Sequence, residues 1–401
     1  MQRNAMGKNL NEIAQELKKN SKKVQLIYAF NGIGKTRLSR EFKSLIEAED
    51  VFGEEKTGLN GKKIIYYNAF TEDLFYWDND LENDEHSKLK IQPNIFTKWI
   101  FEDQGQEVNI SKNFQHYTDQ KLTPHLNAEY SFIDAEGQEV TVNAFTEVTF
   151  SYERGNEEKS ENIKISKGEE SCFIWSIFYS LLSQITEVLN VDKDSIDQDR
   201  ETDAFDNLEY VFIDDPVTSL DENHLIEFAV DLAEIIKKST SELKFIITTH
   251  NPLFYNVLSN EFNNNDTVSG YNSNRHFRKM RLIKTEDMDY ELEGSSDSPF
   301  SYHLFLLNEI KRAAETGEIY KYHFNYMRNI LEKMATFLGY KNWGDLLLPV
   351  RGDKEAYIKR ILNLSSHSKH SAEEIVMISD ADKRMLINLV DEIITIYRYN
   401  S

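Results

Sequence analysis

Residues 29–36 of the chain read AFNGIGKT, and they join an apolar run over 24–30 to a helical pattern that follows. The segment fits the P-loop pattern, except that Ala29 stands where the first glycine belongs. A functionless strand–helix turn is the alternative, but a P-loop needs the same elements: a strand, exposed backbone N–H groups and a helix N-terminus facing the phosphates. We therefore expect Lys35 to reach the β- and γ-phosphates of a nucleotide and Thr36 to ligate Mg²⁺. The loop around that nucleotide would be formed by Asn31, Gly32 and Gly34.

A second segment supports this interpretation. Residues 210–215 read YVFIDD, an apolar strand that ends in two carboxylates. A Walker B strand requires this pattern: Asp214 is expected to hold the metal, and Asp215 lies where a carboxylate activates the attacking water. A strand tip with solvated acids is the alternative, and it becomes a poor explanation once a P-loop is present in the same chain.

Three weaker motifs follow in a fixed order. Residues 165–169 (ISKGE) open a long apolar helix and match a degenerate ABC signature, in which Ser166, Gly168 and Glu169 would contact the γ-phosphate of a nucleotide held by another subunit. Residues 219–221 (SLD) occupy the position of a D-loop. His250 ends the next strand, where a switch histidine would meet the γ-phosphate. A lone strand-end histidine is more often structural, so the order of the motifs carries more weight than any one of them.

The rest of the chain predicts an α/β fold with a parallel sheet. We expect a helix over 8–20, strands at 64–67, 210–213, 243–248 and near 278–284, and helices at 169–189 and 222–238. Asn68, directly after the second strand, is the best candidate for a Q-loop residue. Short alternating runs over about 106–165 predict an antiparallel β insert, and 190–207 reads as an acidic insertion. The domain boundary is expected near 300: an ATPase head over 1–300 and a mostly helical domain over 301–401.

Composition limits the class of protein. Hydrophobic residues make up 40% of the 401, which suits large cores and excludes disorder as the main state. A single cysteine, Cys172, rules out an intramolecular disulfide and makes a cysteine-based zinc site improbable. The N-terminus is polar and no run of 18 apolar residues occurs, so we expect a cytoplasmic protein with no membrane partner.

The C-terminal region offers a second kind of chemistry. Arg328 and Glu332 are four residues apart and therefore share one face of a predicted helix. His367 lies in a Ser/His-rich segment downstream, with His370 three residues further on. Arg, Glu and His suffice to cleave RNA without a metal, since a base, an acid and a cation at the phosphate are what the reaction needs. An exposed ion pair followed by a polar loop is the simpler alternative.

The head motifs together resemble the ABC-type ATPase head of the RecF/SMC-like group. The departures are Ala29, Asp215 in place of the usual glutamate, and Glu169 in place of the signature glutamine. Such a head implies a homodimer that sandwiches each nucleotide between Lys35 of one subunit and Ser166 of the other.

The whole chain further resembles the PrrC/RloC anticodon nucleases, and PrrC more than RloC. The resemblance rests on DDPVTSLD at 214–221 followed by Arg328, Glu332 and a histidine downstream, which it identifies as a ribonuclease site with His367 favoured over His370. It implies ATP or GTP with Mg²⁺ as cofactors, and cleavage of a tRNA anticodon loop to a 2′,3′-cyclic phosphate and a 5′-hydroxyl. It also implies antiphage defence, silencing by a type I restriction–modification enzyme, and either dimers or dimers of dimers.

Two other functions remain open at this point. One is a RecF/SMC-like DNA-repair or effector-recruiting ATPase without nuclease activity, and a transporter subunit is a weaker third. The net charge of −22 argues against a basic nucleic-acid-coating protein. Residues 311–370, however, include 11 basic and 6 acidic residues, so the region around Arg328 is locally basic. The excess of acidic residues therefore belongs to the head.

Overall fold

The computed structural model describes most of the chain, in two compact units, Met1–Ser296 and Asp297–Ser401. The expected boundary was 300. The described residues are 7–48, 61–68, 74–78, 87–92, 97, 100–101, 105–133, 137–154, 158–160, 162–192, 200, 202–216, 222–285, 289–294, 301–365 and 378–397.

The first unit is built on a six-stranded sheet with the order β13-β12-β1-β11-β10-β2. Five strands are parallel, and β13 pairs antiparallel with β12 at one edge. The parallel core explains why β1 and β10 are buried along their whole length and mostly apolar, because such strands are covered by helices on both faces. The strands are β1 (Val24–Tyr28), β2 (Ile64–Asn68), β10 (Tyr210–Asp214), β11 (Lys244–Thr249), β12 (Phe277–Lys284) and β13 (Tyr290–Gly294).

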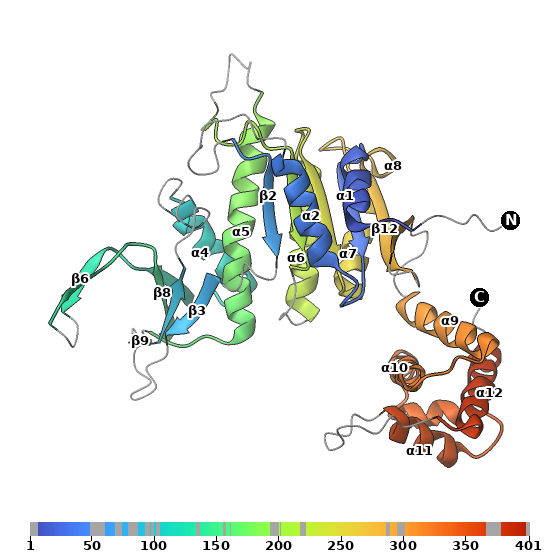
Figure 1. The fold of residues 1–401 in the computed structure, drawn as a ribbon. Coiled ribbons are helices and arrows are strands. Elements are labelled where there is room, and N and C mark those ends of the chain that lie inside the picture. The colour runs from blue at the N-terminus through green and yellow to red at the C-terminus, as the bar shows by residue number, and fades with distance from the viewer. Residues whose placement is uncertain are drawn as a thin grey trace. The chain divides into compact units, whose positions relative to one another are not determined.

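Helices cover both faces of this sheet (Figure 1). On one face, α1 (Leu10–Lys19) and α2 (Lys35–Glu47) pack on residues such as Ile27 and Phe212. On the other face, Leu26 and Val211, which precede these residues in the same strands, pack in a cluster with three helices. These are α5 (Lys167–Asn190), α6 (Glu222–Lys238) and α7 (Pro252–Asn263), and the short α8 (Ser273–His276) follows them. The α/β class predicted from the sequence is confirmed.

The insert between β2 and α5 forms a second, antiparallel sheet with the order β3-β4-β8-β5 and β9 paired to β8. The expectation of β structure throughout 106–165 is wrong at its start: residues 107–117 form helix α4 (Glu107–Tyr117), which buries Ile110, Phe114 and Tyr117. The exposed ribbon β6–β7 extends from this sheet (Figure 1). The strands are β3 (Phe75–Asp78), β4 (Lys88–Ile91), β5 (Leu122–Leu126), β6 (Tyr130–Ile133), β7 (Glu139–Val142), β8 (Glu147–Arg154) and β9 (Glu158–Ser160).

Helix α5 is the central packing element of the head. By length and composition it is apolar enough to cross a membrane, but 78% of its most apolar window is buried inside the protein. Trp175 illustrates this use of apolar surface, since its ring stacks on Phe228 of α6 and meets Tyr67 of β2 edge-on. The apolar surface of α5 therefore joins the antiparallel insert to the main sheet.

The second unit is helical around a core of its own. Its elements are α9 (Ser301–Thr316), α10 (Lys321–Leu338), the 3₁₀ helix η4 (Trp343–Leu347), α11 (Lys354–Ser365) and α12 (Asp380–Tyr397). Each contributes apolar side chains to one cluster, with Phe324, Met327 and Leu331 of α10 at its centre. Helix α10 therefore has one buried side, and its remaining surface is exposed to solvent.

Candidate functional site

The P-loop joins β1 to α2 at the edge of the sheet where the parallel strands end. Gly32 and Gly34 have φ values of 82° and 110°, and Gly34 is the residue that caps α2. Residues with a Cβ atom rarely adopt this left-handed backbone conformation. Both positions therefore need glycine, and the loop turns its backbone toward the place where phosphates bind in this motif.

Lys35 is the first residue of α2 and is only 6% exposed. Its Nζ donates to the carbonyl oxygens of Ala29 and Phe30 at 3.2 and 3.3 Å and to Oδ1 of Asn31 at 3.2 Å. The same Nζ lies 3.5 Å from Oδ2 of Asp215. The P-loop ammonium is thus held inside the loop and is already in contact with the carboxylate of Asp215, which directly follows β10.

Asp214, at the end of β10, is 1% exposed and surrounded by hydroxyl groups. Thr248 donates to its Oδ1, and Ser39 Oγ lies 3.4 Å from its Oδ2. Burial raises the pKa of Asp214, although hydrogen bonds from Thr248 and Thr36 oppose that shift. Thr36 and Asp214, both predicted as magnesium ligands, are therefore in contact with each other.

These oxygen donors fit Mg²⁺. The ion prefers hard oxygen ligands and keeps several waters, so P-loop sites use one hydroxyl and one carboxylate together with the nucleotide phosphates. Among the described residues no group of three His, Cys, Asp or Glu side chains is placed to hold a metal, and a site of this kind does not require one.

Asp215 follows Asp214 with a φ of 54°, in the left-handed region. Its Oδ1 accepts hydrogen bonds from Thr249 Oγ1 and from the backbone N–H of His250, each at 3.2 Å, and its Oδ2 pairs with His250 Nδ1. Burial alone would raise the pKa of Asp215, but the hydrogen bond and charge of His250, together with Lys35, hold it below its ordinary value. The carboxylate is therefore ionised at neutral pH, as a group that orients or activates water must be.

Asn68 lies beside Asp214, because β2 and β10 pair in parallel with these two residues in register. Its Nδ2 donates to the Tyr66 hydroxyl at 2.9 Å, and that hydroxyl lies 2.7 Å from Ser39 Oγ. Ser39, Tyr66 and Thr248 were not expected from the sequence. Thr248 alone had a signal, since it belongs to the Thr-Thr-His run that ends β11.

The residues of the expected signature form the N-terminus of α5. Ser166 Oγ accepts from the Glu169 N–H at 3.2 Å, and Glu169 Oε2 accepts from the Ser166 N–H at 2.7 Å. This reciprocal capping box stabilises the helix start by itself. Gly168 lies in the first turn of α5. The expected D-loop, 219–221, lies outside the described residues.

In the second unit, Arg328 and Glu332 come together on α10. Arg328 Nε donates to Glu332 Oε1 at 2.7 Å, and the two side chains are 37% and 43% exposed. A substrate can therefore approach the pair from solvent. His367 and His370 both lie outside the described residues, so their place relative to the pair stays a prediction.

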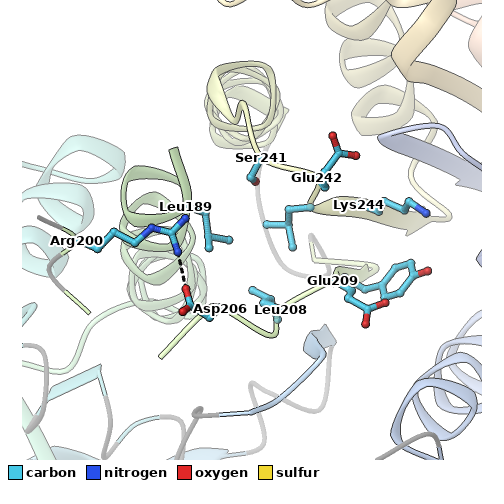
Figure 2. A pocket seen from close by; sticks show the side chains of 10 residues that line it. Leu189, Arg200, Asp206, Leu208, Glu209, Ser241, Glu242 and Lys244 are labelled. Atoms are coloured by element: carbon cyan, nitrogen blue, oxygen red, sulfur yellow. Dashed lines mark hydrogen bonds and ion pairs between the residues drawn. The ribbon is translucent and has the colours of Figure 1, made fainter. Parts of the chain in front are cut away.

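A pocket of about 360 Å³ lies at the opposite ends of the head strands from the P-loop, where β10 and β11 begin (Figure 2). It is lined by residues at the starts of β10 and β11, including Glu209 and Lys244, and by Arg200, which forms an ion pair with Asp206 of the same lining. The P-loop lies where the strands end, so this pocket is separate from the nucleotide site.

Known proteins resemble the chain along nearly its whole length. A curated protein of Escherichia coli, named "Anticodon nuclease", is 49% identical over 416 aligned positions, which cover 97% of this chain and 96% of that protein. The chain belongs to the anticodon nuclease family. A family model described as "AAA domain" also matches residues 139–393 of this chain, a range that extends from the insert of the head into the helical unit.

Solved structures similar to this member of the anticodon nuclease family are heads of SMC proteins. An SMC head bound to the C-terminal winged-helix domain of ScpA is 10% identical with a TM-score of 0.32, and the SMC head domain from Thermotoga maritima is 9% identical with a TM-score of 0.29. Each match covers 69% of this chain and 91% of the other. The nucleotide site of the head is assigned from its own P-loop and strand-end carboxylates.

Proposed function

We propose that this protein is a nucleotide-gated anticodon nuclease, which cleaves tRNA within the anticodon loop. The proposal rests mainly on the 49% identity to a protein named anticodon nuclease, because that identity extends over both the P-loop head and the helical unit. The paired Arg328 and Glu332 on an accessible helix face support it with suitable chemistry.

In this proposal the ribonuclease site consists of Arg328, Glu332 and His367. Glu332 and His367 act as the base and acid: one takes the proton of the ribose 2′-OH and the other gives a proton to the leaving 5′-oxygen. The 2′-oxygen forms a bond to phosphorus as the bond to the 5′-oxygen breaks, which leaves a 2′,3′-cyclic phosphate and a 5′-hydroxyl. The guanidinium of Arg328 stabilises the charge that develops on the phosphate oxygens.

The head supplies the gate. It binds ATP or GTP in the loop of Asn31, Gly32 and Gly34, with Lys35 on the β- and γ-phosphates. Mg²⁺, held by Thr36 and Asp214, would neutralise phosphate charge. Asp215, positioned by His250, orients the attacking water.

We extend the proposal to the assembly. Two heads form a homodimer in which each nucleotide lies between Lys35 of one subunit and the Ser166, Gly168 and Glu169 segment of the other. Such dimers pair further into dimers of dimers, and a type I restriction–modification enzyme in the cytoplasm keeps the nuclease silent until phage infection.

The test uses the purified full chain and total tRNA with and without ATP or GTP. We expect nucleotide-dependent cuts confined to anticodon loops, and fragment ends that are ligated only by an enzyme that requires a 2′,3′-cyclic phosphate. A DNA-repair or effector-recruiting ATPase would hydrolyse nucleotide and leave every tRNA intact, and that result would reject the nuclease function.

A further inference from the structure

Two tyrosines form an exposed stacked pair at the start of α10. The rings of Tyr320 and Tyr322 have centroids 5.7 Å apart and an angle of 18° between their planes. The residues are 51% and 47% exposed. Burial of a large aromatic side chain stabilises a fold strongly, so two neighbouring rings that stay partly exposed to solvent are typical of a binding surface.

The pair is held in place from below by other rings. Tyr322 contacts His323 at 4.1 Å and Tyr326 at 5.3 Å between centroids. His323 is 3% exposed, and its Nδ1 accepts a hydrogen bond from the Tyr320 backbone N–H at 2.9 Å. The stacked pair is therefore anchored to the core on one side. Because the two rings are already held in place, less conformational entropy is lost when a ligand binds to them.

The pair lies on the same helix as the Arg328–Glu332 ion pair. Tyr322 precedes Arg328 by six residues, which is about 9 Å along a helix axis. That distance corresponds to roughly two to three stacked bases at about 3.4 Å each. The buried side of α10 is occupied by Phe324, Met327 and Leu331, so both pairs belong to the helix surface that the core leaves exposed.

The region around the pair is basic on balance, since residues 311–370 hold 11 basic and 6 acidic residues. Close to Tyr322 the charges are mixed: Arg312 on α9 acts on the ring, and so do the carboxylates of Glu309 and Glu318. Lys321, between the two tyrosines, is exposed. Proteins read single-stranded RNA loops by stacking their splayed bases on tyrosine and similar side chains, while cations contact the phosphates. A base inside a duplex is already stacked and cannot use such a surface.

We propose that Tyr320 and Tyr322 form a stacking platform for an unpaired base of the RNA loop that is cut at Arg328 and Glu332. The inference rests on the proposed nuclease function and adds to it a binding site for one class of ligand, the unstacked nucleobase. Stacking tolerates all bases, so the platform positions the loop and does not select its sequence.

The experiment uses the full chain and a synthetic anticodon stem-loop whose loop riboses are 2′-deoxy, which blocks cleavage. A 2-aminopurine base is placed at each loop position in turn, because its fluorescence is quenched when it stacks on a ring. Wild type is compared with Tyr322→Leu, which removes the ring, and with Tyr322→Phe, which keeps it. Tyr76→Leu is the matched control, since Tyr76 in the other unit is 49% exposed.

We expect Tyr322→Leu to weaken stem-loop binding by about 5- to 100-fold and to abolish quenching at one loop position. Tyr322→Phe and Tyr76→Leu should bind as wild type does, and an abasic nucleotide at the quenched position should remove the difference between wild type and Tyr322→Leu. If wild type cleaves tRNA while Tyr322→Leu binds and quenches equally, the platform is wrong and the nuclease function stands. A wild-type chain that neither binds nor cuts the RNA overturns both.

Discussion

The Nζ atom of Lys35 lies 3.5 Å from Oδ2 of Asp215, so the P-loop forms an ion pair with the carboxylate that directly follows β10. Asp215 in turn pairs with His250, which ends β11. Three segments that are distant in the sequence are therefore coupled electrostatically at the edge of the sheet. In the proposed nucleotide site, a phosphate would compete with Asp215 for the ammonium of Lys35, and that competition would link nucleotide binding to the carboxylate proposed to orient water.

Lys35→Ala is expected to abolish nucleotide binding and, with it, tRNA cleavage, because the ammonium is the cation that meets the β- and γ-phosphates. Lys43→Ala, at an exposed lysine of the same helix paired with Glu47, is the control and should leave both activities unchanged. Binding of a fluorescent nucleotide and cleavage of tRNA are measured on the same preparations. Sustained cleavage by Lys35→Ala without nucleotide would show that nucleotide binding does not control the nuclease.

Asp215→Asn should slow nucleotide hydrolysis by about 10²- to 10⁴-fold while nucleotide binding persists, since an amide cannot accept a proton from water. Asparagine tolerates the left-handed backbone of this position, where φ is 54°, so the fold is expected to be kept. Phosphate release and nucleotide affinity separate the two effects. Hydrolysis at the wild-type rate would show that another group activates the water.

Ser166 can be tested for two roles at once, because it caps α5 and is also proposed to contact a nucleotide across the dimer. Ser166→Ala should destabilise the head by about 1 kcal/mol through loss of the cap. Ser166→Asp keeps a capping oxygen but places a negative charge toward the phosphates. We expect it to retain thermal stability and to lose nucleotide-dependent dimerisation in sedimentation. Dimerisation of Ser166→Asp at the wild-type nucleotide concentration would leave Ser166 only the capping role.

The stability of α10 should depend on pH through His323. Burial lowers the pKa of this imidazole, and the charge of Arg312 lowers it further. The folded state therefore favours the neutral ring, so its contribution to stability is complete above the ordinary histidine pKa of about 6.5 and is lost as the pH falls below it. Hydrogen-exchange protection of α10, corrected for intrinsic rates, should drop between pH 7.5 and 5.5. His323→Asn, which keeps an acceptor at the same place, should reduce that drop, and an identical drop in both proteins would be evidence against His323.

The sequence was most informative where local pattern and buried structure coincide. Strands β1 and β10 were predicted to within a residue or two, because parallel strands covered on both faces are mostly apolar, and the motifs that follow them mark where they end. Helix α4 was missed, although Ile110, Phe114 and Tyr117 recur at helical spacing. The alternating runs that follow this helix are typical of strands, and they led to a prediction of β structure for the whole insert.

Contacts between distant segments could not be predicted in the same way. The hydroxyl chain of Ser39 and Tyr66 beside Asp214 depends on how α2, β2 and β10 pack, and no spacing in the sequence encodes it. By contrast, the contact of Arg328 with Glu332 follows from helical periodicity alone, and the structure brings the two together at 2.7 Å.

We propose that tRNA is cleaved in its anticodon loop at the site of Arg328 and Glu332, under control of the nucleotide-binding head. The most direct measurement is sequencing of RNA ends, with their terminal chemistry, after brief expression of wild type, Arg328→Ala, Glu332→Gln and His367→Ala. Glu234→Gln is the matched control, since Glu234 forms an exposed ion pair with Lys238 on α6 of the head. We expect cyclic-phosphate ends within anticodon loops for wild type and the control, and none for the three site variants. Equal cutting by folded Arg328→Ala and Glu332→Gln would contradict it.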